Sequence, residues 1–164
     1  MGVETFYLRP FQPSDQAACK TLILAGLEEH WGFLDLTLNP DLNDIAAAYA
    51  QGLFLTAWQD GQLAGTGALL PAGPGGFQVV RMSVAKHWRR QGLGQLILAG
   101  LESGARKLGA QRLVLETTTS WSEVVQFYLN SGYQITHAQD GDTYFVKALP
   151  TEPFETPLRQ PQDE

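Results

Sequence analysis

The chain has 164 residues, of which 44% are hydrophobic, and a formal net charge of −6 at pH 7. Its length and hydrophobic content suit one globular domain that buries a core without metal or disulfides. The negative charge argues against nucleic acid or an anionic membrane as the main partner. The single cysteine, Cys19, cannot form an internal disulfide, and neither zinc-type spacing, a leader nor a membrane span is evident. We therefore expect a metal-free protein of the reducing cytoplasm.

The first fifty residues are predicted to form one strand and two helices. Residues 5–9 alternate as a strand that ends at Pro10, and residues 13–15 open a helix in which Cys19 is a small buried hydrophobe. The buried stripe of that helix is predicted at Ala18, Leu22 and Ala25, flanked by Leu24 and Leu27. A second helix is expected from residue 40 or 41 to residue 50, with Gly52 ending it. Residues 26–40 are aromatic, apolar and acidic without a clean period.

Three strands follow and are predicted to form an antiparallel meander. Residues 53–58 and 63–70 form a hairpin across an Asp-Gly turn, and residues 77–84 form the third strand. Within the second of these strands, Gly65 and Gly67 indicate a bulge or a close approach of another backbone.

The segment from Val79 to Gly109 reads as a strand, a basic loop with glycines, and an amphipathic helix ended by Gly109. The apolar face of the helix is predicted to comprise Leu93, Leu96, Ile97, Gly100, Leu101, Gly104, Ala105 and Leu108. The loop is a candidate anion site, because first-turn amides lack intrahelical acceptors and favour a phosphate. On physical grounds alone, the glycines could equally ease packing and the arginines could form a solvated edge. The loop matches neither a P-loop nor a dinucleotide fingerprint.

The last third of the chain is predicted to complete a sheet. Residues 111–117 form a strand parallel to 77–84 through a right-handed crossover, so a ligand is expected at the carboxyl ends of these two strands. A short helix follows from about Ser120 to Asn130, and residues 133–139 and 143–149 form a final hairpin. The Pro-rich acidic tail, residues 150–164, is expected to be extended or disordered.

Three blocks of this sequence resemble the GCN5-related N-acetyltransferase (GNAT) superfamily. They are the loop Arg89-Arg90-Gln91-Gly92-Leu93-Gly94 after a V-x-R-M-S-V strand, the strand Leu113-Val114-Leu115-Glu116-Thr117, and the segment Phe127-Tyr128-Leu129-Asn130-Ser131-Gly132-Tyr133. They occur in the family's order and at its spacing. The resemblance implies an α/β (α+β) fold with a mixed central sheet of about seven strands and about four flanking helices, in a single domain over residues 1–149. It also implies acetyl-CoA as cosubstrate and direct transfer to a primary amine of a small molecule or peptide.

The resemblance further implies roles for individual residues. Main-chain groups of Met82, Ser83 and Val84 would pair with the pantetheine arm. The pyrophosphate would be held by Arg89, Arg90, Gln91, Gly92, Leu93, Gly94 and Gln95. Tyr128 matches the tyrosine that protonates the coenzyme thiolate, although helical spacing alone would make it a core aromatic. Many members carry asparagine where this chain has Trp121, so that pantetheine contact is expected to be absent or replaced by stacking.

The general base and the acceptor contacts stay open at this point. Glu116 is the first choice for the base, with bulk water, Glu28, Glu29 or Asp35 as alternatives. In the family the segment after the first helix lines the acceptor pocket, which makes candidates of Glu28, Glu29, His30, Trp31, Phe33 and Asp35; the alternative is that the aromatics pack a corner and the acids face water. A catalytically silent acyl-CoA-binding sensor or assembly module is the second functional hypothesis. Neither nucleic acid nor membrane is an expected partner, and a homodimer through the final hairpin or tail is left open.

Overall fold

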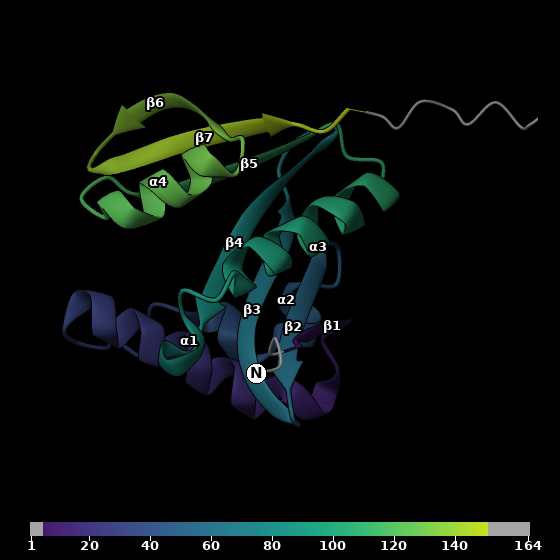
Figure 1. The fold of residues 1–164 in the computed structure, drawn as a ribbon, viewed down its shortest axis with the longest axis vertical. Helices are drawn as coiled ribbons and strands as arrows, with labels where there is room; N and C mark the ends of the chain where they lie inside the picture. Colours follow the sequence, from purple (N-terminus) through teal and green to yellow (C-terminus); the bar gives the residue numbers. More distant parts are fainter. Residues whose placement is uncertain (1–4, 151–164) are drawn as a thin grey trace, which may run out of the picture.

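Seven strands form one mixed sheet in the computed structural model, which describes residues 5–150 (Figure 1). Their bounds are β1 Tyr7–Pro10, β2 Leu53–Gln59, β3 Gln62–Pro71, β4 Gly76–Val84, β5 Arg112–Thr118, β6 Gln134–Gln139 and β7 Asp142–Ala148. The order across the sheet is β1-β2-β3-β4-β5-β7-β6, and every neighbouring pair is antiparallel except β4 and β5. The expected sheet, its meander and its one parallel pair are therefore confirmed.

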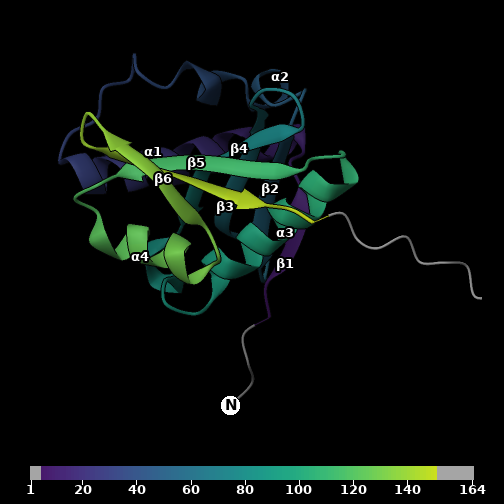
Figure 2. The same ribbon diagram turned by 90° about the horizontal axis from the view of Figure 1, so that it is seen from above.

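The α-helices cover both faces of the sheet. They are α1 Gln16–Trp31, α2 Ile45–Ala48, α3 Leu93–Lys107 and α4 Ser122–Asn130, with short 3-10 turns at Pro13–Asp15, Pro40–Asn43 and Lys86–Trp88. Seen from above, α1 and α2 lie on one side of the strands, and α3 and α4 lie on the other (Figure 2). Each side has its own buried cluster, one around Cys19 and Ile23 of α1 and one around Ile97 and Leu101 of α3. Cys19 is fully buried, as expected.

The parallel strands β4 and β5 stay together only at one end. Their pairing is confined to residues 76–78 of β4 and 112–114 of β5. Beyond these residues the two strands diverge, as Figure 1 shows. The carboxyl-terminal half of β4 therefore has hydrogen-bonded neighbours on its β3 side alone. This divergence places an opening at the carboxyl ends of the two strands, where a ligand was predicted to bind.

A bulge in β4 lies opposite the β3 glycines, and side chains of α3 approach them closely. The register of β3 and β4 shifts between Thr66 and Ala68, because β4 has one extra residue there, and Arg81 in this bulge has a φ of 55°. On the other side, a Cβ on Gly67 would lie 2.5 Å from Cγ2 of Ile97. The absence of a side chain thus lets α3 pack directly on the sheet.

Two of the predicted helix faces need correction. In α1 the buried residues are Cys19 and Ile23, while Ala18 and Ala25 are exposed; apolar residues occur on all sides of this helix, so periodicity could not select the stripe. In α3 the face is formed by Leu93, Ile97, Leu98, Leu101 and Ala105. Leu96 is 41% exposed because it lies to one side of that stripe, and Leu108 is 53% exposed because it is the C-cap residue.

The turns agree with their predictions from the sequence more closely than the two helix faces do. Both Asp-Gly turns, at residues 60–61 and 140–141, have positive φ at both residues and close the predicted hairpins. Gly109 ends α3 with a φ of 83°. The second predicted helix is instead a 3-10 turn followed by one α-turn, the latter capped by the Asp44 carboxylate, which accepts from the N–H of Ala47 at 3.2 Å. The proposed tail lies outside the described residues from position 151 onward.

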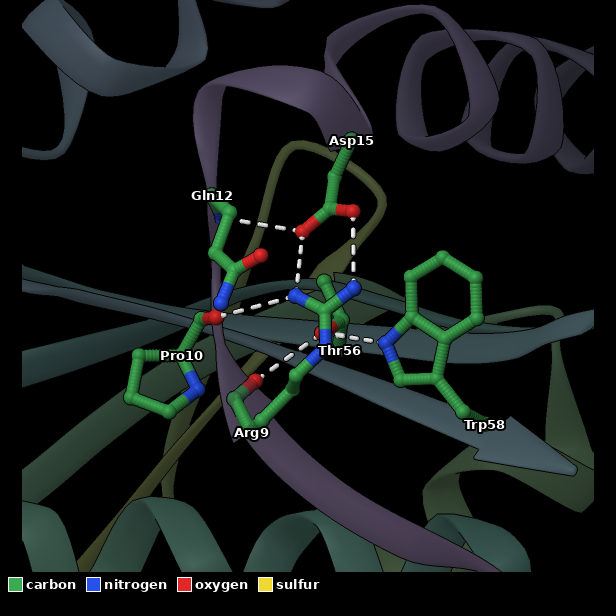
Figure 3. Close-up of polar contacts among 6 residues, drawn as sticks. All are labelled: Arg9, Pro10, Gln12, Asp15, Thr56 and Trp58. Atoms are coloured by element: carbon green, nitrogen blue, oxygen red, sulfur yellow. Dashed lines mark hydrogen bonds and ion pairs between the residues drawn. The ribbon is translucent and has the colours of Figure 1, made fainter. Parts of the chain in front are cut away.

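A charged pair joins β1 to the start of α1 (Figure 3). The guanidinium of Arg9 donates to both oxygens of Asp15 at 2.6 and 2.9 Å, and it lies 4.5 Å from the ring centre of Trp58. The Asp15 carboxylate also accepts from the N–H of Gln12 at 2.8 Å. Asp15 is only 3% exposed, so this carboxylate is bonded on all sides rather than solvated.

Replacing Asp15 by asparagine is expected to lower the free energy of unfolding by about 1.5–3 kcal/mol near neutral pH, because bonds to a charged partner are lost. The hydrogen bond from Arg9 holds the pKa of Asp15 below its usual range. Its stabilisation is therefore present above the unfolded value, about 3.9, and is lost as pH falls through the lower folded value. Urea unfolding at a series of pH values should show the two proteins converging only below about pH 4. The Asp60→Asn variant, in an exposed turn, serves as the control. A constant gap down to the lowest pH would contradict the assignment.

Candidate functional site

Two adjoining cavities occupy the opening between β4 and β5. The larger, of about 550 Å³, lies between α4 and the loop that joins β4 to α3, and we call it the loop cavity. The smaller, of about 290 Å³, is lined by α1, β4, β5 and the start of α4, and we call it the α1 cavity. The two cavities meet at a junction where they share six lining residues. These are Met82, Ser83, Val84, Arg89, Val124 and Tyr128.

The loop cavity contains the N-terminus of α3. Gly92, with a φ of 81°, is the N-cap residue and supplies no side chain to cap the helix. The first helical hydrogen bond at this end runs from the N–H of Leu96 to the carbonyl of Gly92 at 3.1 Å. The amides of residues 93–95 thus have no acceptor within the helix and are available to an anion. A Cβ on Gly94 would lie 3.4 Å from the ring of Phe127, so the glycine brings the helix start close to α4.

The two arginines of the loop have different environments. Arg89 is on the boundary between the cavities, where its Nη1 and Nη2 donate to the Glu29 carboxylate at 2.7 and 2.9 Å and its Nε donates to the carbonyl of Val84 at 3.1 Å. The hydrogen bonds that Arg89 donates to the Glu29 carboxylate raise the pKa of Arg89 above its ordinary value. The side chain of Arg90 is 88% exposed and its Nη2 lies 4.0 Å from a carboxylate oxygen of Glu123 across the loop cavity. Arg90 is therefore the arginine more readily available to a bound anion.

Most of the predicted coenzyme residues lie together in the loop cavity. Those that line it are Met82, Ser83, Val84, Arg89, Arg90, Gly92, Leu93, Gly94 and Gln95. Two do not. Gln91 lines neither cavity, and its amide donates to the carbonyl of His87 at 3.4 Å. Trp121 lines the α1 cavity alone.

Tyr128 is the buried polar residue at the junction. It is 6% exposed, and its ring packs against Phe127, Tyr133 and Phe145 at centroid distances of 5.1–5.8 Å. Burial raises the pKa of Tyr128 above the usual value near 10, so the phenol is neutral at physiological pH. Within residues 5–150 no side chain or main-chain group forms a hydrogen bond with its hydroxyl, which leaves the O–H available to a ligand in either cavity.

Of the four carboxylates considered as a base, Glu116 is the one that lines the α1 cavity. It is exposed on β5 opposite Tyr144 of β7, whose pKa is raised by a hydrogen bond to the Glu116 carboxylate. Glu29 is paired with Arg89, as described above. Asp35 accepts from the N–H and hydroxyl of Thr37 at 2.9 and 2.6 Å, and these bonds lower the pKa of Asp35. Glu28 lines neither cavity.

An aromatic group forms one wall of the α1 cavity. The Trp121 ring stacks on His30 with a centroid distance of 4.3 Å and an interplanar angle of 26°, and it lies 5.4 Å from the Trp31 ring. His30 and Trp121 line the cavity, whereas Trp31 and Phe33 do not, and Phe33 is 66% exposed. The ring partners of Trp121 are thus on α1, and the expectation about its pantetheine contact stays a prediction.

Arg81 is a site residue that sequence reasoning missed. It lines the α1 cavity from the β4 bulge, where its Nε and Nη2 donate to the Asp41 carboxylate at 3.0 and 2.6 Å. Tyr49 also donates to Asp41, at 2.7 Å. The available signal was a single charged residue within the apolar run V-V-R-M-S-V. Its function is to join the bulge to the segment that follows α1.

Comparison with known proteins agrees with this geometry. A protein-family model, the acetyltransferase (GNAT) family, matches residues 16–133. The chain belongs to the GNAT family. It is 32% identical over 143 residues to an uncharacterised N-acetyltransferase of Bacillus subtilis (strain 168), YvbK, and the match covers 85% of this chain and 90% of that protein. Two further curated relatives are longer, and the chain spans about half of their length.

Solved structures share the same GNAT fold. An acetyltransferase of the GNAT family from Staphylococcus aureus Mu50 superposes with a TM-score of 0.82 at 18% identity, covering 89% of this chain and 100% of that one. The PaiA N-acetyltransferase of Thermoplasma acidophilum, in complex with coenzyme A, superposes with a TM-score of 0.76 at 17% identity, covering 88% and 99%. Both the predicted family and the predicted fold class are confirmed, and with them the enzyme class, an N-acetyltransferase.

Two further observations concern only the described part of the chain. Within residues 5–150, no three His, Cys, Asp or Glu side chains gather closely enough to hold a metal ion. No helix in the same range has the length and apolar character needed to cross a bilayer.

Proposed function

We propose that this GNAT protein transfers the acetyl group of acetyl-CoA directly to a primary amine of a small molecule or peptide. The observation that supports this most is the position of Tyr128, which lines both cavities and whose hydroxyl has no hydrogen-bond partner among the described residues. One cavity has an uncapped helix N-terminus for a pyrophosphate, and the other has an exposed carboxylate, Glu116, for an amine. A two-substrate transfer needs two such cavities that meet at the reacting atoms.

In this proposal the coenzyme occupies the loop cavity. Its pyrophosphate would accept hydrogen bonds from the amides of residues 92–95, with Arg90 nearby and Arg89 retained as a link to α1. The pantetheine arm would lie along residues 82–84 of β4, because this edge of the strand has no neighbour once β5 diverges. Main-chain groups provide these contacts, so the side chains of Met82, Ser83 and Val84 need not be polar.

The chemistry then requires the amine nitrogen to lose two protons and the leaving thiolate to gain one. The amine arrives protonated and must lose a proton, for which Glu116 is the proposed base. The neutral amine attacks the thioester carbon, the new C–N bond forms and the C–S bond breaks. The departing thiolate takes a proton from the Tyr128 hydroxyl, or is at least stabilised by a hydrogen bond from it. The nitrogen releases its second proton to solvent as the amide forms, and solvent restores the tyrosine proton.

An acetyl-cysteine intermediate at Cys19 does not fit the structure. Cys19 is fully buried in the cluster beneath α1 and lines neither cavity. Burial raises the pKa of Cys19 to about 12, so the reactive thiolate is scarce at neutral pH. Direct transfer is therefore the simpler reaction. A lone thiol also fits the expected reducing setting of the cytoplasm.

Thermal unfolding with and without acetyl-CoA tests the coenzyme site. At about a hundredfold excess over the dissociation constant, binding should add about 2.7 kcal/mol of stability. For a chain of this size, that corresponds to a rise in Tm of about 5–10 °C. Adenosine at the same concentration lacks the pyrophosphate and should give a much smaller rise. Equal shifts, or no shift with acetyl-CoA, would contradict the proposed pyrophosphate site.

A further inference from the structure

We infer that the acceptor is a small primary amine that has an aromatic group and no acidic group. The inference rests on the proposed function and concerns the α1 cavity, where that function places the acceptor. Three properties of this cavity support it: the pairing of its arginines, the chemistry of its walls, and its volume.

The arginines that line the α1 cavity are both neutralised by carboxylates. Arg81 is bonded to Asp41 at 2.6 and 3.0 Å, and Arg89 is bonded to Glu29 at 2.7 and 2.9 Å. A carboxylate or phosphate on the acceptor would therefore meet an arginine whose hydrogen bonds are already made. Displacing one ion pair to form another gives little net gain, while the acidic group would still lose its hydration. This arrangement disfavours amino acids, nucleotides and sugar phosphates as acceptors.

The remaining charge in the cavity suits an amine. Glu116 lines the same cavity and is exposed on β5, with the Tyr144 hydroxyl as its bonded neighbour. A protonated amino group would be attracted to this carboxylate and would arrive close to Tyr128, which borders both cavities. An acidic group placed beside the amine would instead be repelled by Glu116.

One part of the cavity wall is apolar and aromatic. Ile23 and Leu27 of α1 and Val124 of α4 line it together with the stacked pair of His30 and Trp121. Trp31, which is 52% exposed, extends this aromatic group beside the cavity. An acceptor with an aromatic ring would bury apolar surface here and could pack edge-on or offset against the indole. A short polar amine would gain neither contact.

The volume of about 290 Å³ sets the size of the acceptor. Cavities for drug-sized ligands range from about 300 to 1,000 Å³, so this one is at the small end. A single ring with a short aminoalkyl chain is the kind of molecule that such a space holds.

Initial rates of acetyl transfer to matched amines test the inference. We expect kcat/KM for 2-phenylethylamine to exceed that for phenylalanine, which differs from it only by a carboxylate, by at least about tenfold. The value for 2-phenylethylamine should also exceed that for ethanolamine, which lacks the ring, by about tenfold or more. Comparable values for all three amines would overturn the inference, and so would a preference for the amino acid.

Two variants tie these preferences to named residues. Trp121→Asn should lower kcat/KM for 2-phenylethylamine at least about fivefold, mainly through KM, with little change for ethanolamine. Glu29→Gln should release Arg89 and raise the activity with phenylalanine relative to 2-phenylethylamine by about threefold or more. Tyr7→Asn, a change at a half-exposed aromatic on the edge strand β1, should change neither ratio and is the control. Unchanged ratios in both site variants would overturn the inference.

The transfer assays distinguish a failure of this inference from a failure of the proposed function. Transfer to polar or acidic amines at rates equal to those for aromatic amines would overturn the inference alone. Acetyl-CoA binding without transfer to any amine would overturn both and would favour a silent coenzyme-binding module.

Discussion

Replacing Tyr128 by phenylalanine is expected to lower kcat for acetyl transfer by about ten- to a hundredfold, while the affinity for acetyl-CoA stays nearly unchanged. The variant keeps the ring that packs against Tyr133 and Phe145 and removes only the hydroxyl at the junction of the cavities. Because burial raises the pKa of this phenol, the group holds its proton at neutral pH, which is the state that the proposed acid requires. Steady-state rates with saturating acetyl-CoA, together with ligand-induced thermal shifts, would separate kcat from coenzyme binding.

The matched control is Tyr133→Phe. The two rings are 5.7 Å apart, but Tyr133 lines neither cavity and its hydroxyl donates to Glu102 at 3.1 Å. Losing this bond to a charged group should cost about 1.5–3 kcal/mol of stability without lowering kcat. A similar loss of kcat in both variants would mean that packing, not the Tyr128 proton, controls the rate. An unchanged kcat in Tyr128→Phe would remove the proposed acid from the mechanism.

The parts of the site that could be predicted are those encoded locally. The loop before α3 has its glycines, its arginines and its helix start within a few consecutive residues, so its uncapped helix N-terminus, which favours an anion, could be predicted from a short stretch of sequence. The hairpin turns are equally local, since an Asp-Gly pair specifies its own positive φ values. Tyr128 needed more. Its helical spacing fits an ordinary core aromatic, and the resemblance of the surrounding block to a family distinguished it.

The parts that could not be predicted depend on partners far apart in the chain. Arg89 looks like a free phosphate ligand in the sequence, yet it is bonded to Glu29, sixty residues earlier. Trp121 is at a position where many relatives have an asparagine. It stacks on His30 because α1 ends beside the start of α4. Such pairings depend on how far β4 and β5 diverge, and no local pattern records that divergence.

Gly52 shows the same limit at a single residue. Its position after an expected helix suggested a stop signal, which usually requires a positive φ. Gly52 is not among the glycines with positive φ. Instead, a Cβ at this position would lie only 1.8 Å from the backbone oxygen of Leu69 on β3. The glycine is thus required by tertiary packing of β2 against β3, which the sequence around it does not reveal.

Gly52→Ala is therefore expected to be among the most destabilising conservative changes in the chain, at roughly 3 kcal/mol of unfolding free energy. The added methyl group would overlap a backbone carbonyl, which cannot rotate away as a side chain can. Leu69 is fully buried and is paired with Leu53, so a shift of its carbonyl would disturb the centre of the sheet. Urea unfolding gives the free energy, and the family fold should persist with a lowered midpoint.

The neighbouring change Gln51→Ala is the control, because Gln51 is exposed and should change stability by no more than about 0.5 kcal/mol. Gly67→Ala gives an intermediate case: its added methyl group would meet side-chain atoms of Ile97, Met82 and Leu101, which can adjust in part. A graded order of stability loss, with Gly52 above Gly67 and Gly67 above Gln51, would show that backbone overlap costs more than side-chain overlap. Equal losses at the two glycines would instead indicate that β2 and β3 can move apart. That movement would also disturb the part of the sheet that supports α3 and the proposed anion site.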